Sequence, residues 1–126
     1  MELKVGMYVM TNDRMKIGQI KGFCTCEMCE KRGFYEPIID GDIIITDYDK
    51  SQGFHGYRFY DNPIDLIEVG DYVNGKRVYN ISIVDGLKYL DVEVEDYLSD
   101  TPFINADQIT SIVTKEQFDS MKYEVK

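Results

Sequence analysis

The sequence has one histidine, His55, only three cysteines and no long apolar run. No stretch approaches the roughly 18 residues that a membrane-spanning helix requires. The first ten residues, MELKVGMYVM, alternate and carry an early acid, so we expect no secretion signal there. These absences predict a protein that works inside a cell, where thiols stay reduced and clustered cysteines indicate a metal more than a disulfide.

Basic residues are scarce relative to acids. The 126 residues include 14 Lys and Arg against 23 Asp and Glu, for a net charge of −9. Phosphate contacts need clustered Lys and Arg, and the only local basic patch is Lys21, Lys31 and Arg32, so we expect no direct binding to nucleic acid. The negative charge would favour binding to a basic protein partner, because the electrostatic potentials would be complementary. Alternatively, it only keeps the protein soluble.

Familiar catalytic motifs are also missing. The sequence contains no GxGxxG, no GxxxxGK[ST] and no HExxH. If His55 binds a metal, no histidine remains to activate a Ser or Cys nucleophile. We therefore expect a protein that is not an enzyme. The exception is a metal with only three protein ligands, where an open position could support hydrolysis.

Strand patterns dominate the sequence, which is 44% hydrophobic and includes 10 Tyr and 6 Phe. Asp40-Gly41, Asn74-Gly75 and Asp85-Gly86 each predict a two-residue type I′ hairpin turn. Only TKEQFDSMKYE, which begins at Thr114, predicts a helix, with Thr114 and Gln117 forming a capping box. The expected fold is mainly β, with two small antiparallel bent-sheet or barrel-like units and a short C-terminal helix.

Two stretches of the chain are alike. VGMYV begins at Val5 and VGDYV at Val69, and each precedes a polar turn and a second strand. NPIDLIEV at 62–69 and ADQITSIVT at 106–114 also share an Ile-x-x-Ile pattern. This tandem similarity predicts an N-terminal unit over 1–68 and an acidic C-terminal unit over 69–126. The competing interpretation is chance similarity among short strands.

The three cysteines lie within six residues, as Cys24-x-Cys26-x-x-Cys29. Tetrahedral zinc prefers soft thiolates at such spacing. Burial of the thiols as small apolar side chains is a poor alternative, because CTCEMCEKRG is polar and turn-like. A redox pair of Cys26 and Cys29 would need a βαβ setting that the sequence does not show. We therefore expect a structural Zn²⁺ site in the first unit.

The fourth zinc ligand must come from another part of the chain. A hairpin at Asp40-Gly41 would return the chain beside the cluster, and the loop DKSQGFHG could then fold over the thiols. His55 in this loop is the predicted fourth ligand, completing a closed Cys3His site with Cys24, Cys26 and Cys29. Asp47 or Asp49 could take its place.

The strongest concentration of charge lies over residues 85–107, which hold seven acids and one lysine. A turn at Asp85-Gly86 would pair Ile81 with Leu90 and Tyr79 with Val92, and so direct the acids outward. This acidic strip is the predicted contact surface for a partner, or else a solvated edge strand whose charge resists aggregation. Its predicted contact residues are Tyr89, Asp91, Glu93, Glu95, Asp96 and Tyr97.

KRGFYEPI at 31–38, IDLIEVGDYVNGKRV at 64–78 and SIVTKEQFDSMKYEV at 111–125 resemble stretches of small phage and prophage proteins of Gram-positive bacteria. This resemblance implies the cytoplasm of a bacterial host. With the small size, the acidity and the thiols, the chain is also similar to zinc-bearing type II anti-CRISPR proteins. That similarity implies binding to a basic surface of an RNA-guided CRISPR nuclease, which would block loading of target DNA.

Two other functions compete with nuclease inhibition. A non-catalytic phage accessory or structural module with an unknown protein partner would explain the strands, the repeat and the acidity equally well. A zinc-dependent nucleic-acid binder would explain the cysteines but conflicts with the net charge of −9.

Overall fold

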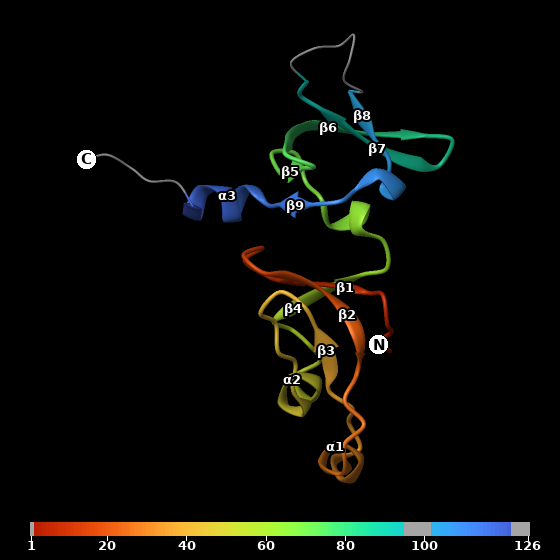
Figure 1. Cartoon of the computed structure of the whole chain (residues 1–126), viewed down its shortest axis with the longest axis vertical. Coiled ribbons are helices and arrows are strands. Elements are labelled where there is room, and N and C mark those ends of the chain that lie inside the picture. Colours follow the sequence, from red (N-terminus) through yellow and green to blue (C-terminus); the bar gives the residue numbers. More distant parts are fainter. Residues whose placement is uncertain (1, 95–101, 122–126) are drawn as a thin grey trace, which may run out of the picture. The chain divides into compact units, whose positions relative to one another are not determined.

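The computed structural model describes residues 2–94 and 102–121 (Figure 1). The chain divides into two compact units, residues 1–61 and 62–126. All strand pairs in the described parts are antiparallel, which confirms the mainly β class, and their sheets are open and do not close into barrels. None of the helices described is long and apolar enough to cross a bilayer.

The first unit contains a four-stranded sheet in the order β3-β2-β1-β4. Two short helices, which the sequence patterns did not predict, interrupt the strands. The elements are β1 (Tyr8–Thr11), β2 (Ile17–Phe23), α1 (Glu27–Arg32), β3 (Pro37–Ile39), α2 (Asp47–Ser51) and β4 (Tyr57–Tyr60).

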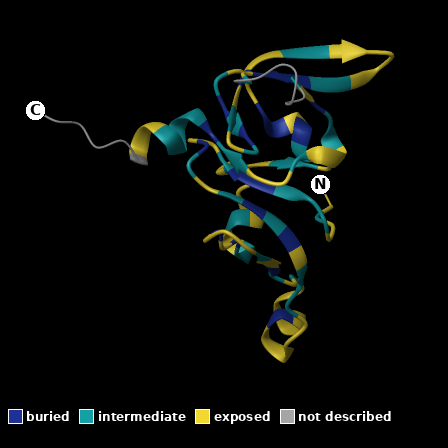
Figure 2. Ribbon diagram, turned by 45° about the horizontal axis from the view of Figure 1, so that its top comes forward, coloured by how far each residue is buried: buried dark blue, intermediate teal, exposed yellow. Residues whose placement is uncertain are grey.

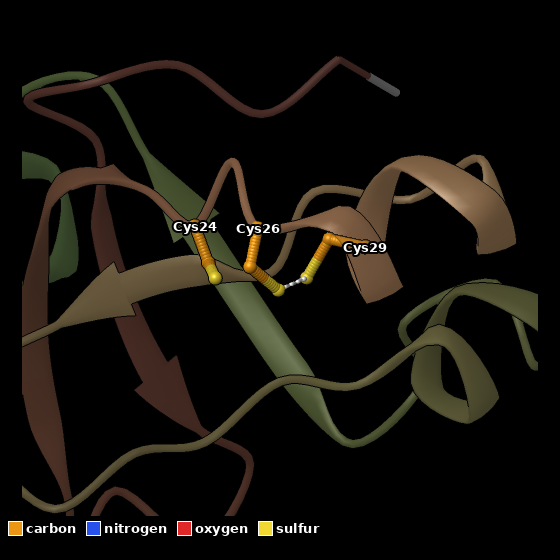
Figure 3. A group of neighbouring side chains, drawn as sticks. All are labelled: Cys24, Cys26 and Cys29. Carbon is orange, nitrogen blue, oxygen red and sulfur yellow. Dashed lines mark hydrogen bonds between the residues drawn. The ribbon is translucent and has the colours of Figure 1, made fainter.

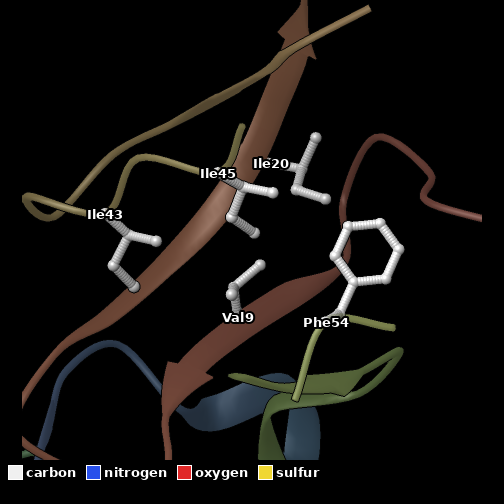
Figure 4. Close-up of a cluster of buried hydrophobic side chains, with 5 residues drawn as sticks. All are labelled: Val9, Ile20, Ile43, Ile45 and Phe54. Atoms are coloured by element: carbon white, nitrogen blue, oxygen red, sulfur yellow. The ribbon is translucent and has the colours of Figure 1, made fainter. Parts of the chain in front are cut away.

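The core of the first unit joins its sheet to two segments that lie outside it. Val9 of β1 and Ile20 of β2 are fully buried, and they pack with Ile43, Ile45 and Phe54 (Figure 4). Ile43 and Ile45 alternate with the exposed Ile44, so the extended chain before α2 turns one apolar face inward. Burial of these side chains is the main favourable contribution to the stability of this unit.

The predicted hairpin at Asp40-Gly41 is wrong, because β3 pairs with β2 instead of with the chain that follows it. Asp40 stays against β2, where its Oδ1 accepts from the Gln19 N–H at 2.7 Å. A type I′ turn at Asp40-Gly41 would need positive φ at these two residues. Positive φ is found one position later, at Gly41 (79°) and Asp42 (57°). Long-range contact with β2 therefore overrides the local turn preference.

At Gly18 the chain after β3 lies close against the backbone of β2. A Cβ at Gly18 would overlap the carbonyl oxygen of Asp40. We expect Gly18→Ala to lower the free energy of unfolding of the first unit by about 1–3 kcal/mol, because backbone must move to relieve the overlap. The measurement is amide hydrogen exchange of β1 and β2, which reports the opening free energy of these strands.

Gly22→Ala is the matched control on the same strand. A Cβ at Gly22 would meet only Ile38 Cδ1, at 4.0 Å, so this substitution should leave exchange in β1 and β2 nearly unchanged. Equal exchange in the two variants would contradict the close approach at Gly18.

The second unit contains a five-stranded sheet in the order β8-β7-β6-β5-β9. Its buried apolar side chains come from the strands and from a short helix at its start; they are Ile64, Leu66, Ile67, Val73, Val78, Leu90, Val92 and Ile104. The elements are η1 (Pro63–Leu66), β5 (Tyr72–Val73), β6 (Lys76–Val84), β7 (Leu87–Val92), β8 (Phe103–Ile104), η2 (Ala106–Gln108), β9 (Ile112–Val113) and α3 (Lys115–Met121).

Three local predictions in the second unit are confirmed. The turn residues Asn74-Gly75 have φ of 53° and 79°, and those of Asp85-Gly86 have the same pair of values, as type I′ turns require. The flanking residues pair as expected across both turns. The capping box of α3 is also present, since the Thr114 N–H donates to Gln117 Oε1 and the Gln117 N–H donates to Thr114 Oγ1.

The two similar segments make the same backbone hydrogen bonds, each within its own unit. Gly6 (φ 95°) donates to the Ile20 carbonyl, and Gly70 (φ 99°) donates to the Val78 carbonyl, both at 2.8 Å. The following residue accepts in return, so the Ile20 N–H donates to Met7 and the Val78 N–H to Asp71. A positive φ is the reason that both positions carry glycine.

The compact units divide the chain before Asn62, whereas the sequence pattern placed the boundary after residue 68. Asn62 caps η1, where its Oδ1 accepts from the Ile64 N–H at 3.1 Å. Ile64, Leu66 and Ile67 follow this cap, are buried and belong to the compact second unit. Residues 62–68 thus form the start of the second unit.

Candidate metal centre

The three cysteines lie in the segment that joins β2 to β3 (Figure 3). Cys24 follows β2 directly, and its N–H donates to the Glu36 carbonyl at 2.8 Å, which ties the two ends of the segment together. Cys26 is the N-cap residue of α1, with extended backbone and no capping hydrogen bond from its side chain. Cys29 is the only buried residue of this helix. The sequence spacing therefore places three thiols around the first turn of α1.

The thiols lie close enough together to bind one metal ion. The sulfur atoms of Cys26 and Cys29 are 3.5 Å apart, and all three sulfur atoms lie within 4.8 Å of one another. All three cysteines are free, with no disulfide. Two sulfur atoms that each lie about 2.3 Å from a tetrahedral zinc ion would be about 3.8 Å apart. The observed spacing therefore fits a thiolate-bound ion with only small adjustments.

The surroundings of two thiols shift their pKa values in opposite directions. The N–H of Cys29, and then the thiols of Cys24 and Cys29, lower the pKa of Cys26 to about 7. The N–H of Glu36 lowers the pKa of Cys29, but burial and the neighbouring thiols outweigh it, so that this pKa lies above its ordinary value. A cation among the three sulfur atoms would relieve that cost, because it favours the charged form of each thiol.

The structure does not bring His55 to the thiols. In the described ranges, the group of ligand atoms around the thiols contains the three sulfur atoms alone. His55 lies in the exposed loop after α2, where its carbonyl accepts from Asn12 Nδ2. Its Nε2 is 3.4 Å from the position that a Cβ on Gly53 would take, so the ring lies over its own loop. The route that was expected to carry His55 to the cluster depended on the hairpin at Asp40-Gly41, which does not form.

The two alternative ligands are engaged elsewhere. Asp49 Oδ2 accepts from the Thr46 N–H at 2.8 Å and completes the capping box of α2. Asp47 lies 3.8 Å from Arg32 in an ion pair between α2 and α1. The capping pattern Thr46-x-x-Asp49 could have indicated α2 in the sequence, but five residues are too few to show a helical apolar period.

An open pocket of about 420 Å³ lies in the first unit and was not predicted. Thr25, between two of the cysteines, and Gly33, which ends α1, both line it. Lys50 also lines it, with its Nζ 5.5 Å from the centre of the Phe34 ring. The other lining residues are Glu2, Leu3, Phe23, Phe34, Tyr35 and Phe54. The segment that carries the thiols therefore forms part of the wall of an aromatic pocket.

The predicted exposure of Asp91 is wrong. The pairing of Ile81 with Leu90 is confirmed, and Asp91 pairs with Asn80 in the same register. Beyond this pair a bulge at Tyr79 places Val78 opposite Val92, so the predicted pairing of Tyr79 with Val92 is wrong. Asp91 is only 7% exposed, and its Oδ2 accepts from Asn80 Nδ2 at 2.9 Å and from Ser82 Oγ at 2.8 Å. A buried carboxylate with these bonds has a local structural role.

The other predicted contact residues are only partly described. Glu93 is exposed and forms an ion pair with Arg77 at 2.9 Å, and Tyr89 is half-buried. Glu95, Asp96 and Tyr97 lie outside the described residues. Of the six predicted contacts, only Glu93 is both described and exposed, so the acidic strip stays a prediction.

Comparisons with models of protein families, with curated proteins and with solved structures find no match to this chain.

Proposed function

We propose that the chain is a non-catalytic binding module whose first unit is ordered by a zinc ion bound to Cys24, Cys26 and Cys29. The observation that carries this proposal is the convergence of three reduced thiols within 4.8 Å. Zinc fits better than harder ions such as Mg²⁺ or Ca²⁺, because those prefer oxygen ligands.

The metal would have a structural role, because Cys29 is the only buried residue in the segment between β2 and β3. α1 has six residues, and isolated helices shorter than about 12 residues are marginal in water. Most of α1 is exposed (Figure 2), and Cys29 is the only residue of this helix that is buried. A zinc ion would join the start and the first turn of α1 to the end of β2, and would thereby hold one wall of the aromatic pocket.

Amide hydrogen exchange with and without zinc tests this role. Removing zinc with a chelator should reduce protection of the amides over residues 24–36 by at least about tenfold, because metal binding is coupled to local folding. The amides of β6 and β7 in the second unit are the internal control and should not change. Equal protection of residues 24–36 in the two states would overturn the structural role of the metal.

A second candidate concerns the partner of the module. The net charge of −9 and the exposed Glu93 support binding to a basic protein surface. Together with the resemblance to phage proteins, these features lead us to propose a type II CRISPR nuclease as the partner, with loading of target DNA as the blocked step.

Order-of-addition assays of DNA cleavage test the nuclease proposal. Cleavage should fall when the chain is added before target DNA and should persist when the chain is added afterwards. Glu93→Lys should weaken the inhibition without unfolding the chain, since Glu93 is exposed. Unchanged cleavage at high excess with several nuclease orthologues would remove this candidate and leave the metal-ordered module with another partner.

A further inference from the structure

The surroundings of the three thiols suggest a more specific property, which rests on the zinc site proposed above. The thiols have a buried side and an exposed side, because Cys29 is 3% exposed whereas Cys26 is exposed to solvent. An ion among the three sulfur atoms would therefore have one side toward solvent. Tetrahedral zinc has four positions, and the thiols supply three.

The fourth ligands that the sequence indicated are held in other interactions. The His55 ring lies over Gly53, and its loop is held to the β1–β2 turn by the hydrogen bonds from Asn12 Nδ2 to the His55 carbonyl and from the Asn12 N–H to the Gly56 carbonyl. Bringing His55 to the thiols would break these bonds, and bringing Asp49 would uncap α2. Each movement costs the free energy of the broken hydrogen bonds, whereas binding of a ligand from solution breaks none of them.

Charge near the thiols selects the kind of external ligand. Three thiolates and one divalent cation carry a net charge of −1. The neighbouring charges largely neutralise one another, since Lys31 pairs with Glu27 at 3.2 Å and Arg32 pairs with Glu36 at 3.3 Å, while Glu30 is exposed and adds a further negative charge. An anionic fourth ligand would meet repulsion from this surplus, whereas a neutral donor would not.

We propose that the metal has an exchangeable fourth position that takes a neutral nitrogen donor of the imidazole class from outside the chain. The metal centre would then be an accessible binding site as well as a structural one. A histidine side chain on another molecule has this chemistry, and so does free imidazole, which serves as the probe.

Cobalt substitution measures thiolate ligation and the fourth position separately. The metal-free chain is loaded with Co²⁺, and the intensity of the sulfur-to-cobalt charge-transfer band counts the bound thiolates. The ligand-field bands report the whole coordination set. Imidazole is then added, and sodium azide is added to a parallel sample as the anionic control.

We expect a three-thiolate charge-transfer band that persists through the titration, with ligand-field bands that shift and saturate with imidazole. Azide should produce a weaker shift. His55→Ala should behave like the wild-type chain in both respects, because His55 is not among the ligands in this account.

Three results would contradict the account, and they can be told apart. Absence of the charge-transfer band would overturn the metal site itself. A three-thiolate band with ligand-field bands that do not change on addition of imidazole would overturn only the exchangeable position. If His55→Ala then altered the spectrum, the fourth ligand would be His55. An equal or stronger response to azide would overturn the preference for a neutral donor.

Discussion

Replacing Cys29 with serine is expected to weaken zinc binding by more than about 100-fold. Loss of a group that only supports a ligand typically costs about 10–100-fold in metal affinity, and loss of a ligand should cost more. The Cys29 sulfur lies 3.5 Å from that of Cys26 and is one of the three proposed ligands. Its removal therefore leaves two sulfur ligands. The measurement is competition for zinc against a chromophoric chelator.

Two further variants keep this prediction testable if Cys29→Ser perturbs folding. Cys26→Ser removes an exposed thiol that makes no capping hydrogen bond, so it should weaken zinc binding without affecting the metal-free fold. Met28→Ala changes an exposed, uncharged side chain in the same helix and should leave zinc affinity unchanged. Wild-type affinity in Cys26→Ser would contradict the proposed ligand set.

Replacing Asp71 with alanine should destabilise the second unit by about 2–4 kcal/mol. Asp71 is fully buried, and its two carboxylate oxygens accept from the N–H groups of Glu68 at 2.7 Å and of Lys115 at 2.9 Å. One bond holds the turn before β5, and the other joins the start of α3 to that turn. Alanine would leave both N–H groups without this acceptor, and burying an unpaired polar group is costly.

Hydrogen exchange of β6 and β7 measures this effect within the second unit, where it is not mixed with unfolding of the first. Asp71→Asn keeps one acceptor oxygen and should fall between the wild-type chain and Asp71→Ala. Asp107→Ala removes an exposed acid of the same unit and should change stability by less than about 0.5 kcal/mol. Similar effects of Asp107→Ala and Asp71→Ala would refute the special role of Asp71.

The features that the sequence predicted correctly are local. Two residues determine each type I′ turn in the second unit, and Thr114 and Gln117 define the helix cap between them. The clustering of the three thiols follows from their spacing and from the helical turn between Cys26 and Cys29. Interactions within a few residues are visible in a sequence because few competing arrangements exist.

The features that sequence reasoning missed depend on distant contacts. Asp40-Gly41 had the same turn signature as the correct cases, but β2 holds Asp40 through Gln19. The bulge at Tyr79 depends on pairing with β7, and the burial of Asp91 depends on its contacts with Asn80 and Ser82 of the neighbouring strand. The expected approach of His55 to the thiols relied on the first of these errors. When the predicted strand pairing is wrong at one point, every residue position that is inferred from that pairing is wrong as well.

The measurement that tests the account most directly is native mass spectrometry of the chain purified without chelator, with elemental analysis of the same sample. The account predicts about one zinc ion per wild-type chain, and no zinc in a variant with Cys24, Cys26 and Cys29 all replaced by serine. Wild-type chain that contains no metal, and that takes up none when zinc is supplied to the reduced protein, would contradict the proposed metal centre.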